Sequence, residues 1–458
     1  MTWNGRFPVM SKHDPPNPAN CRLPLVSRCR QSCKAAPGCL NNWYPGTNFR
    51  RAHILAYSGR PTASDESAPA MDFDLTDPQR QIRDQITRIC AKFDDAYWME
   101  RDRTATFPDA FFAAMAEGNW LGIAMPEAYG GAGLGISEAA IMMQAVAESG
   151  AAMSGASAIH INIFGLNPVV VYGTDAQKSR MLPPLIAGKD KACFGVTEPN
   201  AGLNTTELSL RADRDGDVYR INGQKIWTST AQVANKILLL ARTTPLDKVK
   251  RKSHGLTLFY TDLDRAHADV RLIHKMGRHA VDSNMVFFED MRVPVEDRIG
   301  EEGEGFRALI HGLNPERILV AAEAVGIGRA ALSRAARYAR ERVVFGRPIG
   351  QNQGIQHPLA KNWAELEAAD LLVQKAAWLY DNGRECGAEA NAAKYLAAEA
   401  GYHACEQAVM THGGMGYAQE FHVERLFRES LIPRIAPVSR ELILSYLAER
   451  VLDLPKSY

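Results

Sequence analysis

Residues 313–326 read LNPERILVAAEAVG, and at this stretch the chain returns from a β-rich region to helix. Pro315 suits the first turn of a helix, where its missing N–H would have no partner. Glu316 follows it, and a carboxylate at that position is favoured by the helix dipole. The Ala-rich apolar run that comes next predicts a long helix. Glu316 is therefore either an ordinary first-turn residue or a carboxylate that removes a proton.

The chain from this stretch to the C-terminus has the composition and periodicity of helices. Short links that contain glycine separate the helical segments, and short links favour antiparallel neighbours. We therefore predict an antiparallel four-helix bundle. Its helices are expected within residues 321–343, 354–383, 388–414 and 439–454.

The region before the bundle has the pattern of β-strands. Short apolar or alternating runs follow one another without helical segments between them, which favours a small barrel or sandwich. The dipeptide Asn222-Gly223 stands between two β-rich flanks and predicts a hairpin turn. Residues 72–190, in contrast, space their apolar residues as helices do. The predicted fold is therefore α+β, with domains over residues 71–190, 191–303 and 304–458.

Composition limits the possible function classes. The formal net charge of +1 gives no global field that would recruit nucleic acid or an anionic membrane. No apolar run approaches the roughly 20 residues that a membrane-spanning helix needs. Four cysteines are scattered over the chain, which indicates a reducing compartment. The four early ones lack C-x-x-C spacing, so the sequence predicts no metal site; they are Cys21, Cys29, Cys33 and Cys39.

Residues 1–70 differ from the rest of the chain. Up to Arg60 they hold nine Lys or Arg and a single acidic residue, Asp14, with many prolines and no sustained periodicity. We interpret this segment as a disordered extension, a targeting segment, or translation from a start codon placed too far upstream. We therefore expect a cytoplasmic, bacterial-type protein, or one of the mitochondrial matrix if the segment is a transit peptide.

Two stretches of the β-rich region carry groups that suit a flat cofactor with a polar edge. In CFGVTEPNAGLNTT (193–206), exposed N–H groups and hydroxyls could hold a ring edge or a pyrophosphate, and the alternative is an ordinary polar loop. In KIWTST (225–230), Trp227 and Ser229 share one strand face because side chains alternate. This pair suits stacking and hydrogen bonding, although a core tryptophan has the same pattern.

Two links between the predicted bundle helices are also candidates. In RERVVFGRPIGQNQGIQ, Arg342 can neutralise a diphosphate and Phe345 can pack on a heterocycle, and the alternative is a plain turn. In THGGMGYAQE, Gly413 and Gly414 either allow close approach of a ligand or simply cap a helix. His412 has no partner at a recognisable spacing, so we interpret it as a structural histidine.

In this order and at these spacings, the motifs resemble the acyl-CoA dehydrogenase family of flavoproteins, from about Met71 to the C-terminus. The resemblance implies an N-terminal helical domain, a middle β-barrel domain and a C-terminal four-helix bundle. It also implies a homotetramer that binds FAD, with part of each site supplied by a neighbouring subunit. The matching cofactor-binding positions are Phe194, Val196, Thr197, Gly202, Trp227, Ser229, Arg342, Phe345, Gln353, Gly413, Gly414 and Ser439.

The chemistry implied by the resemblance is α,β-dehydrogenation of an acyl-CoA thioester. A carboxylate removes the α-proton, the β-hydrogen leaves as hydride to flavin N5, and the electrons pass to an electron-transfer flavoprotein. Many family members carry the base in the last loop, where this chain has Pro437, which cannot act as a base. NPERIL matches the subgroup with the base on the first bundle helix, as in isovaleryl- and long-chain-type enzymes. The resemblance therefore implies Glu316 as base and Arg317 as its neighbour near the CoA-binding region.

Other functions are compatible with the same fold. An acyl-CoA oxidase or flavin monooxygenase would let reduced flavin react with O2. A homologue that binds flavin or CoA without catalysis is a further alternative, because Pro437 also lacks the N–H that the family uses to hold the thioester oxygen. Glu441 is the alternative base. The position of the base suits both branched-chain and fatty acyl-CoA oxidation in lipid metabolism.

Overall fold

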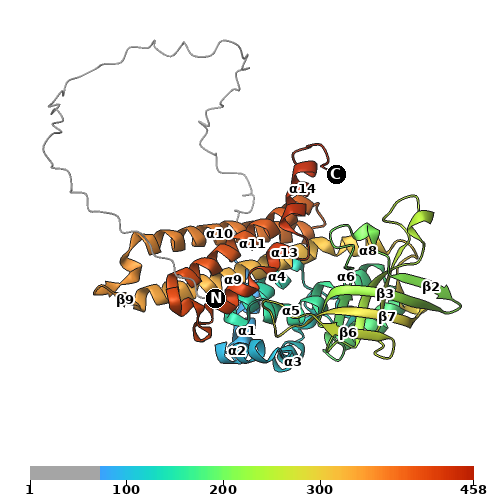
Figure 1. The fold of residues 1–458 in the computed structure, drawn as a ribbon, viewed down its shortest axis with the longest axis horizontal. Helices are drawn as coiled ribbons and strands as arrows, with labels where there is room; N and C mark the ends of the chain where they lie inside the picture. The colour runs from blue at the N-terminus through green and yellow to red at the C-terminus, as the bar shows by residue number, and fades with distance from the viewer. Residues whose placement is uncertain (1–72, 458) are drawn as a thin grey trace, which may run out of the picture. The chain divides into compact units, whose positions relative to one another are not determined.

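The computed structural model describes residues 73–457, so the predicted extension over residues 1–70 and its four cysteines lie outside the described residues. The elements follow the predicted change from helix to strand and back to helix (Figure 1). The cysteines of the described part are free and buried, and they are Cys90, Cys193, Cys386 and Cys405.

Helix α1 (Asp77–Cys90) shows how the N-terminal helices arise from local sequence. Thr76 caps it, because the Thr76 side chain accepts from the N–H of Gln79 while the Gln79 side chain accepts from the N–H of Thr76. Ile82 and Ile86 recur at helical spacing and are buried. The helices that follow are α2 (Asp95–Thr104), α3 (Asp109–Glu117), α4 (Ile136–Val146), α5 (Ala152–Phe164), α6 (Asn167–Tyr172) and α7 (Asp175–Ile186).

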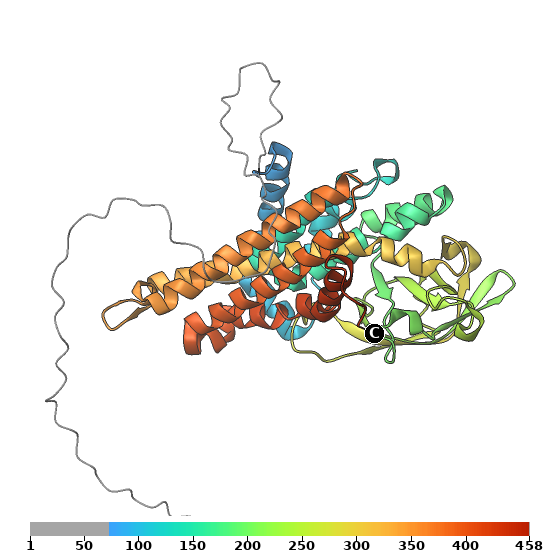
Figure 2. The same cartoon turned by 90° about the horizontal axis from the view of Figure 1, so that it is seen from above.

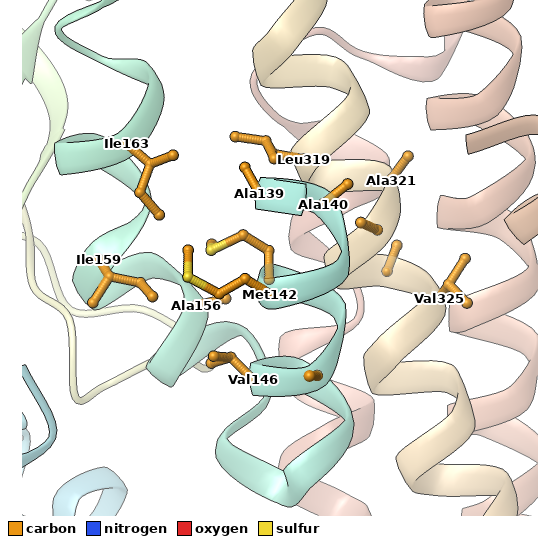
Figure 3. Packing of buried hydrophobic residues seen from close by; sticks show 14 of the residues in the cluster. Ala139, Ala140, Met142, Val146, Ala156, Ile159, Ile163, Leu319, Ala321 and Val325 are labelled. Atoms are coloured by element: carbon orange, nitrogen blue, oxygen red, sulfur yellow. The ribbon is translucent and has the colours of Figure 1, made fainter. Parts of the chain in front are cut away.

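Helices α4 and α5 pack against the first bundle helix, α9 (Leu313–Glu341), in the largest apolar cluster. Figure 3 shows side chains of these three helices directed toward one another, with Met142, Ile159 and Leu319 from one helix each. The stretch Ile136–Tyr172 is long and apolar enough to cross a membrane by composition, yet 71% of its most apolar window is buried inside the protein. Its apolar character is thus accounted for by core packing.

Strands β1 to β8 form an eight-stranded sheet in the order β6-β7-β3-β2-β4-β5-β8, in which β1 pairs with β4, and β9 and β10 form a separate two-stranded sheet. The rings of Tyr219 on β3 and Phe259 on β5 lie 4.9 Å apart although two strands separate β3 from β5. The sheet therefore curls around a core of its own, as a barrel does. The strands are β1 (Ala192–Gly195), β2 (Arg211–Asp215), β3 (Val218–Ser229), β4 (Lys236–Arg242), β5 (Leu256–Asp262), β6 (Ala268–Leu272), β7 (Ser283–Pro294) and β8 (Arg298–Ile299).

The predicted hairpin turn at Asn222-Gly223 is wrong. Both residues lie inside β3, which continues to Ser229, and the turn into β3 instead uses Gly216, which has a φ of 61°. The Asn222 side chain accepts from the N–H of Asp290 on β7, at a point where the pairing of β3 with β7 shifts register. This turn-favouring dipeptide forms a β-bulge instead, because the residues on both sides of it pair with β7 and keep the strand extended.

The C-terminal region is helical, as predicted. Among the described residues α9, α10 (Gln353–Asp381) and α11 (Gly387–His412) are long and pack on one another. The fourth predicted helix is the short α14 (Arg440–Arg450), which packs against α11, and α4 packs along α9 and α10 (Figure 2). The remaining elements are α8 (Gly305–His311), β9 (Val343–Val344), β10 (Arg347–Pro348), α12 (Val423–Glu429) and α13 (Ile432–Ile435).

Candidate active site

Glu316 lies in the first turn of α9 and is only 6% exposed. Its Oε2 is buried without a hydrogen-bond partner among the described residues. Burial raises the pKa of Glu316 from 4.5 to about 7, although neighbouring cations oppose the rise. A residue that only completes a helix dipole can stay in solvent, whereas this carboxylate is enclosed and retains an unused acceptor atom. Enclosure and an unused acceptor are what a proton-accepting base requires.

Three basic side chains on three helices act on Glu316. His160 on α5, Arg317 on α9 and Lys394 on α11 each act electrostatically to keep the carboxylate ionised. Arg317 donates from Nη1 to the side chain of Asn314 at 3.1 Å. Lys394 is fully buried, and its Nζ donates to the carbonyl of Val438 at 2.6 Å. Burial, with Arg317 nearby, lowers the pKa of Lys394 to about 8.

A cavity of about 110 Å³ lies beside Pro315, the residue that precedes the buried carboxylate. Its wall is mainly apolar and comes from the N-terminal helices and from α9 and α10. Residues that line it include Met125, Ile136, Ile163, Val170, Asn167 and Tyr380. Its apolar side chains suit an apolar group, and Asp381, whose carboxylate accepts from the N–H groups of Ile136 and Ser137, adds a polar part to the lining.

The polar turn after β1 is held against β3 by buried groups. The carbonyl of Thr197 accepts from the N–H of Ile226 at 2.9 Å. Lys225, which is fully buried, donates to the carbonyl of Val196 at 2.9 Å and to Glu198 at 2.8 Å. Burial lowers the pKa of Lys225 to about 8 despite the Glu198 carboxylate. The backbone from Val196 to Glu198 is thereby set beside the strand that carries Trp227.

Trp227 has a φ of 61° within a bulge of β3 and is 55% exposed, so it is not a core residue. Thr228 beside it is fully buried, while Ser229 is again accessible, so both predicted side chains lie on the outer face. Ser229 accepts from Nη2 of Arg278 at 2.9 Å. An open aromatic plane with a hydroxyl and a guanidinium nearby fits a flat cofactor with a polar edge.

The predicted residues of the bundle links lie elsewhere. Arg342, Phe345 and Gln353 are exposed at the β9–β10 hairpin and the start of α10, which Figures 1 and 2 show at the end of the bundle away from the sheet. Phe345 is 100% exposed. Trp227 lies on β3 of the sheet, so these residues and Trp227 belong to different parts of the fold. Gly413 and Gly414 follow α11, and a Cβ on either would meet nothing within 4 Å, so the backbone there is open.

The other predicted residues have simpler surroundings. Phe194 lies on β1 and packs on the cluster beneath the sheet, while Gly202 is exposed in the turn that follows. Ser439 caps α14 by accepting from the N–H of Leu442 at 3.3 Å. His412 is buried, bonds the carbonyl of Ala408 at 2.7 Å and stacks on a tyrosine, as a structural histidine does.

The groups at the last loop, between α13 and α14, are exposed, unlike Glu316 on α9. Pro437 is exposed between α13 and α14. Glu441 is exposed and pairs with Arg440 at 2.7 Å, which lowers its pKa. An exposed, paired carboxylate is a weak base, so the surroundings of Glu316 suit proton removal better.

Sequence reasoning missed several groups that the fold brings to the site. His160, Arg278 and Lys394 belong to segments without a recognisable motif, while Lys225 and Glu323 lie inside quoted stretches in which other residues were singled out. A lysine inside the Ala-rich α11 was the one available signal, because a charged residue among apolar ones needs a partner. The missed residues are His160, Lys225, Arg278, Glu323 and Lys394.

Comparison with known proteins identifies the family. Models of the acyl-CoA dehydrogenase N-terminal, middle and C-terminal domains match residues 76–189, 193–291 and 303–452. Acyl-CoA dehydrogenase FadE12 of Mycobacterium tuberculosis is 36% identical over 387 residues, which cover 84% of this chain and 98% of that protein. The Caffeyl-CoA reductase-Etf complex subunit CarC of Acetobacterium woodii is 34% identical over 334 residues, covering 72% and 86%.

A solved structure agrees with these relatives. The butyryl-CoA dehydrogenase of Megasphaera elsdenii matches with a TM-score of 0.79 and 30% identity, covering 83% of this chain and 100% of that one. The three matched domains follow the observed order of helices, sheet and helices. The chain therefore belongs to the acyl-CoA dehydrogenase family and is an FAD-dependent oxidoreductase.

Proposed function

We propose that this enzyme converts an acyl-CoA thioester to the 2-enoyl-CoA and that Glu316 removes the α-proton. The observation that carries the proposal is the enclosed Glu316 carboxylate with an unpartnered Oε2 among the described residues. Its pKa of about 7 makes it a much stronger base than an exposed glutamate, and about half of it is ionised at neutral pH. Family membership supports the reaction type.

The chain's own groups support each part of this reaction. Oε2 of Glu316 takes the proton, and the cationic Arg317 and Lys394 stabilise the negative charge that develops on the substrate as the proton leaves. The cavity beside Pro315 takes the apolar acyl group. FAD, when bound, supplies the acceptor for the β-hydrogen and its two electrons. Because Pro437 has no N–H, the donor for the thioester oxygen must come from another group.

FAD binding is assigned to two groups of residues. Thr197, Trp227 and Ser229 would hold the flavin ring, because an accessible indole and hydroxyl adjoin the turn held by Lys225. Phe194, Val196 and Gly202 complete this turn. The exposed link residues Arg342, Phe345, Gln353, Gly413 and Gly414 serve the FAD of a neighbouring copy, and Ser439 lies on the last loop.

This division of the site implies an assembly, which we propose to be a homotetramer. Electrons are proposed to leave through an electron-transfer flavoprotein. Two observations support that partner: the chain belongs to this family, and a relative carries the name of an Etf complex subunit. The acyl group is a fatty or branched-chain one, of a size that the cavity admits.

The test is anaerobic reduction of the enzyme-bound flavin by a panel of acyl-CoA esters, from branched short chains to long straight chains. Wild-type enzyme should lose its flavin absorbance with at least one ester. E316Q should keep FAD but reduce it roughly 10²- to 10⁴-fold more slowly, because the shape is kept and the base is lost. E441Q is the matched control and should react as wild type does.

Three results would contradict the proposal. Wild-type rates in E316Q would remove Glu316 as the base. Rapid reoxidation by O2 with release of peroxide would instead assign the enzyme to the oxidases, and flavin that no ester reduces would favour a non-catalytic role.

A further inference from the structure

Helix α9 places a second buried acid on the same face as Glu316. Glu323 follows seven residues later, two helical turns along, and is 1% exposed. Two carboxylates on one buried helix face repel each other and lose the solvation of water, so the arrangement needs a compensating cation.

His160 on α5 supplies that cation. Its Nδ1 lies 2.5 Å from Oε1 of Glu323, and both side chains are almost completely buried. Burial alone would lower the pKa of His160, but the Glu323 carboxylate outweighs it and the pKa is raised. His160 also interacts electrostatically with Glu316, and among the charges around Glu316 it has the largest influence.

Other charged groups face this pair. Arg278, from the loop between β6 and β7, acts on both His160 and Glu323 and donates to Ser229 at 2.9 Å. Arg317 on α9 and Lys394 on α11 also act electrostatically on Glu316. The two carboxylates and the imidazole thus belong to one buried network that runs from the proposed base toward the proposed flavin edge.

We propose that His160, anchored by its ion pair with Glu323, is a positioning residue that keeps Glu316 ionised inside the apolar interior. This inference rests on the proposed role of Glu316 as base. A histidine that merely joins α5 to α9 would affect stability alone. A histidine that sets the charge of the base changes the pH at which the enzyme becomes active.

The experiment compares the full-length, FAD-loaded H160N variant and the double variant H160N/E323Q with wild type. The first readout is the acid limb of the pH profile of kcat/KM. The second needs no turnover: the carboxyl band of Glu316 is titrated by infrared spectroscopy and assigned by its absence in E316Q. H422N is the matched control, because His422 is partly buried and its charged neighbours are Asp95, Glu424, Arg425 and Arg334.

H160N should raise the midpoint of the acid limb of kcat/KM and the midpoint of the infrared titration of Glu316 by about one pH unit. On the acid side this corresponds to about a tenfold loss of activity, and activity should recover at alkaline pH. In H160N/E323Q the Glu323 carboxylate, which repels Glu316, is also removed. The midpoint of the double variant should therefore lie between those of wild type and H160N. H422N should keep the wild-type midpoint. Asparagine at position 422 also tolerates the left-handed backbone conformation that His422 adopts.

An H160N midpoint equal to that of wild type would overturn the inference. If H160N does not fold, the double variant decides alone: a midpoint above wild type supports the inference, and a wild-type midpoint refutes it. Full activity in E316Q would refute the proposed base instead, while the infrared titration would still report the coupling between His160 and Glu316.

Discussion

Replacing Glu316 by glutamine should stabilise the protein at the same time as it slows catalysis. Folding raises the pKa of Glu316 from 4.5 to about 7, a difference of about 2.5 units. One unit corresponds to about 1.4 kcal/mol, so the ionised carboxylate lowers the free energy of unfolding by about 3 kcal/mol. The side chain is buried, so solvent screening reduces this figure little.

The sign of the pH dependence follows from the same shift. Below pH 4.5 the carboxyl is protonated in the folded and the unfolded state and carries no cost. Between pH 4.5 and about 7 the folded state retains a proton that the unfolded state has lost, so the free energy of unfolding falls as pH rises. The full cost is present above about pH 7. E316Q has no such cost at any pH.

Urea unfolding of wild type, E316Q and the exposed control E441Q at about pH 5 and about pH 8 measures the effect. The free energy of unfolding of E316Q should exceed that of wild type by about 3 kcal/mol at about pH 8 and by much less at about pH 5. E441Q should follow wild type closely, because Glu441 is exposed. A difference between E316Q and wild type that does not depend on pH would refute the reasoning.

Two further substitutions test the flavin face and the packing of the bundle. Trp227→Ala should weaken FAD retention about tenfold, seen as a lower ratio of flavin to protein absorbance, because the exposed ring is available for stacking. Trp378→Ala, which removes a tryptophan with similar exposure (52%) from α10, should leave that ratio unchanged, and equal ratios in both variants would contradict the assignment. Gly401→Val should lower stability in thermal unfolding by about 1–3 kcal/mol, since its Cβ would lie 2.4 Å from the carbonyl of Ala324. Gly354→Ala is the control and should leave stability unchanged, because its Cβ would meet nothing within 4 Å. Equal melting temperatures for Gly401→Val and Gly354→Ala would show that α9 and α11 can separate.

The order of helix, sheet and helix was predictable because it depends on local periodicity. Residues such as Ile82 and Ile86 repeat at 3.6-residue spacing, and this pattern persists whatever packs against it. The hairpin at Asn222-Gly223 was not predictable in the same way. Its local turn preference competes with pairing to β7, a strand about 65 residues away in the sequence. In the folded protein the pairing of β3 with β7 outweighs the local turn preference, and Asn222-Gly223 lies at a β-bulge instead of a turn.

For the candidate site too, some features could be predicted from local sequence and others depend on tertiary packing. The family, the helix that carries Glu316 and the absence of a carboxylate at position 437 could all be predicted from the amino-acid sequence. Only the tertiary structure decided that Glu316 is enclosed, that Trp227 is open to solvent, and that His160 meets Glu323 across 163 residues of chain. Desolvation and the distance between charges determine how readily a carboxylate takes up a proton. Both quantities exist only after distant segments have packed together.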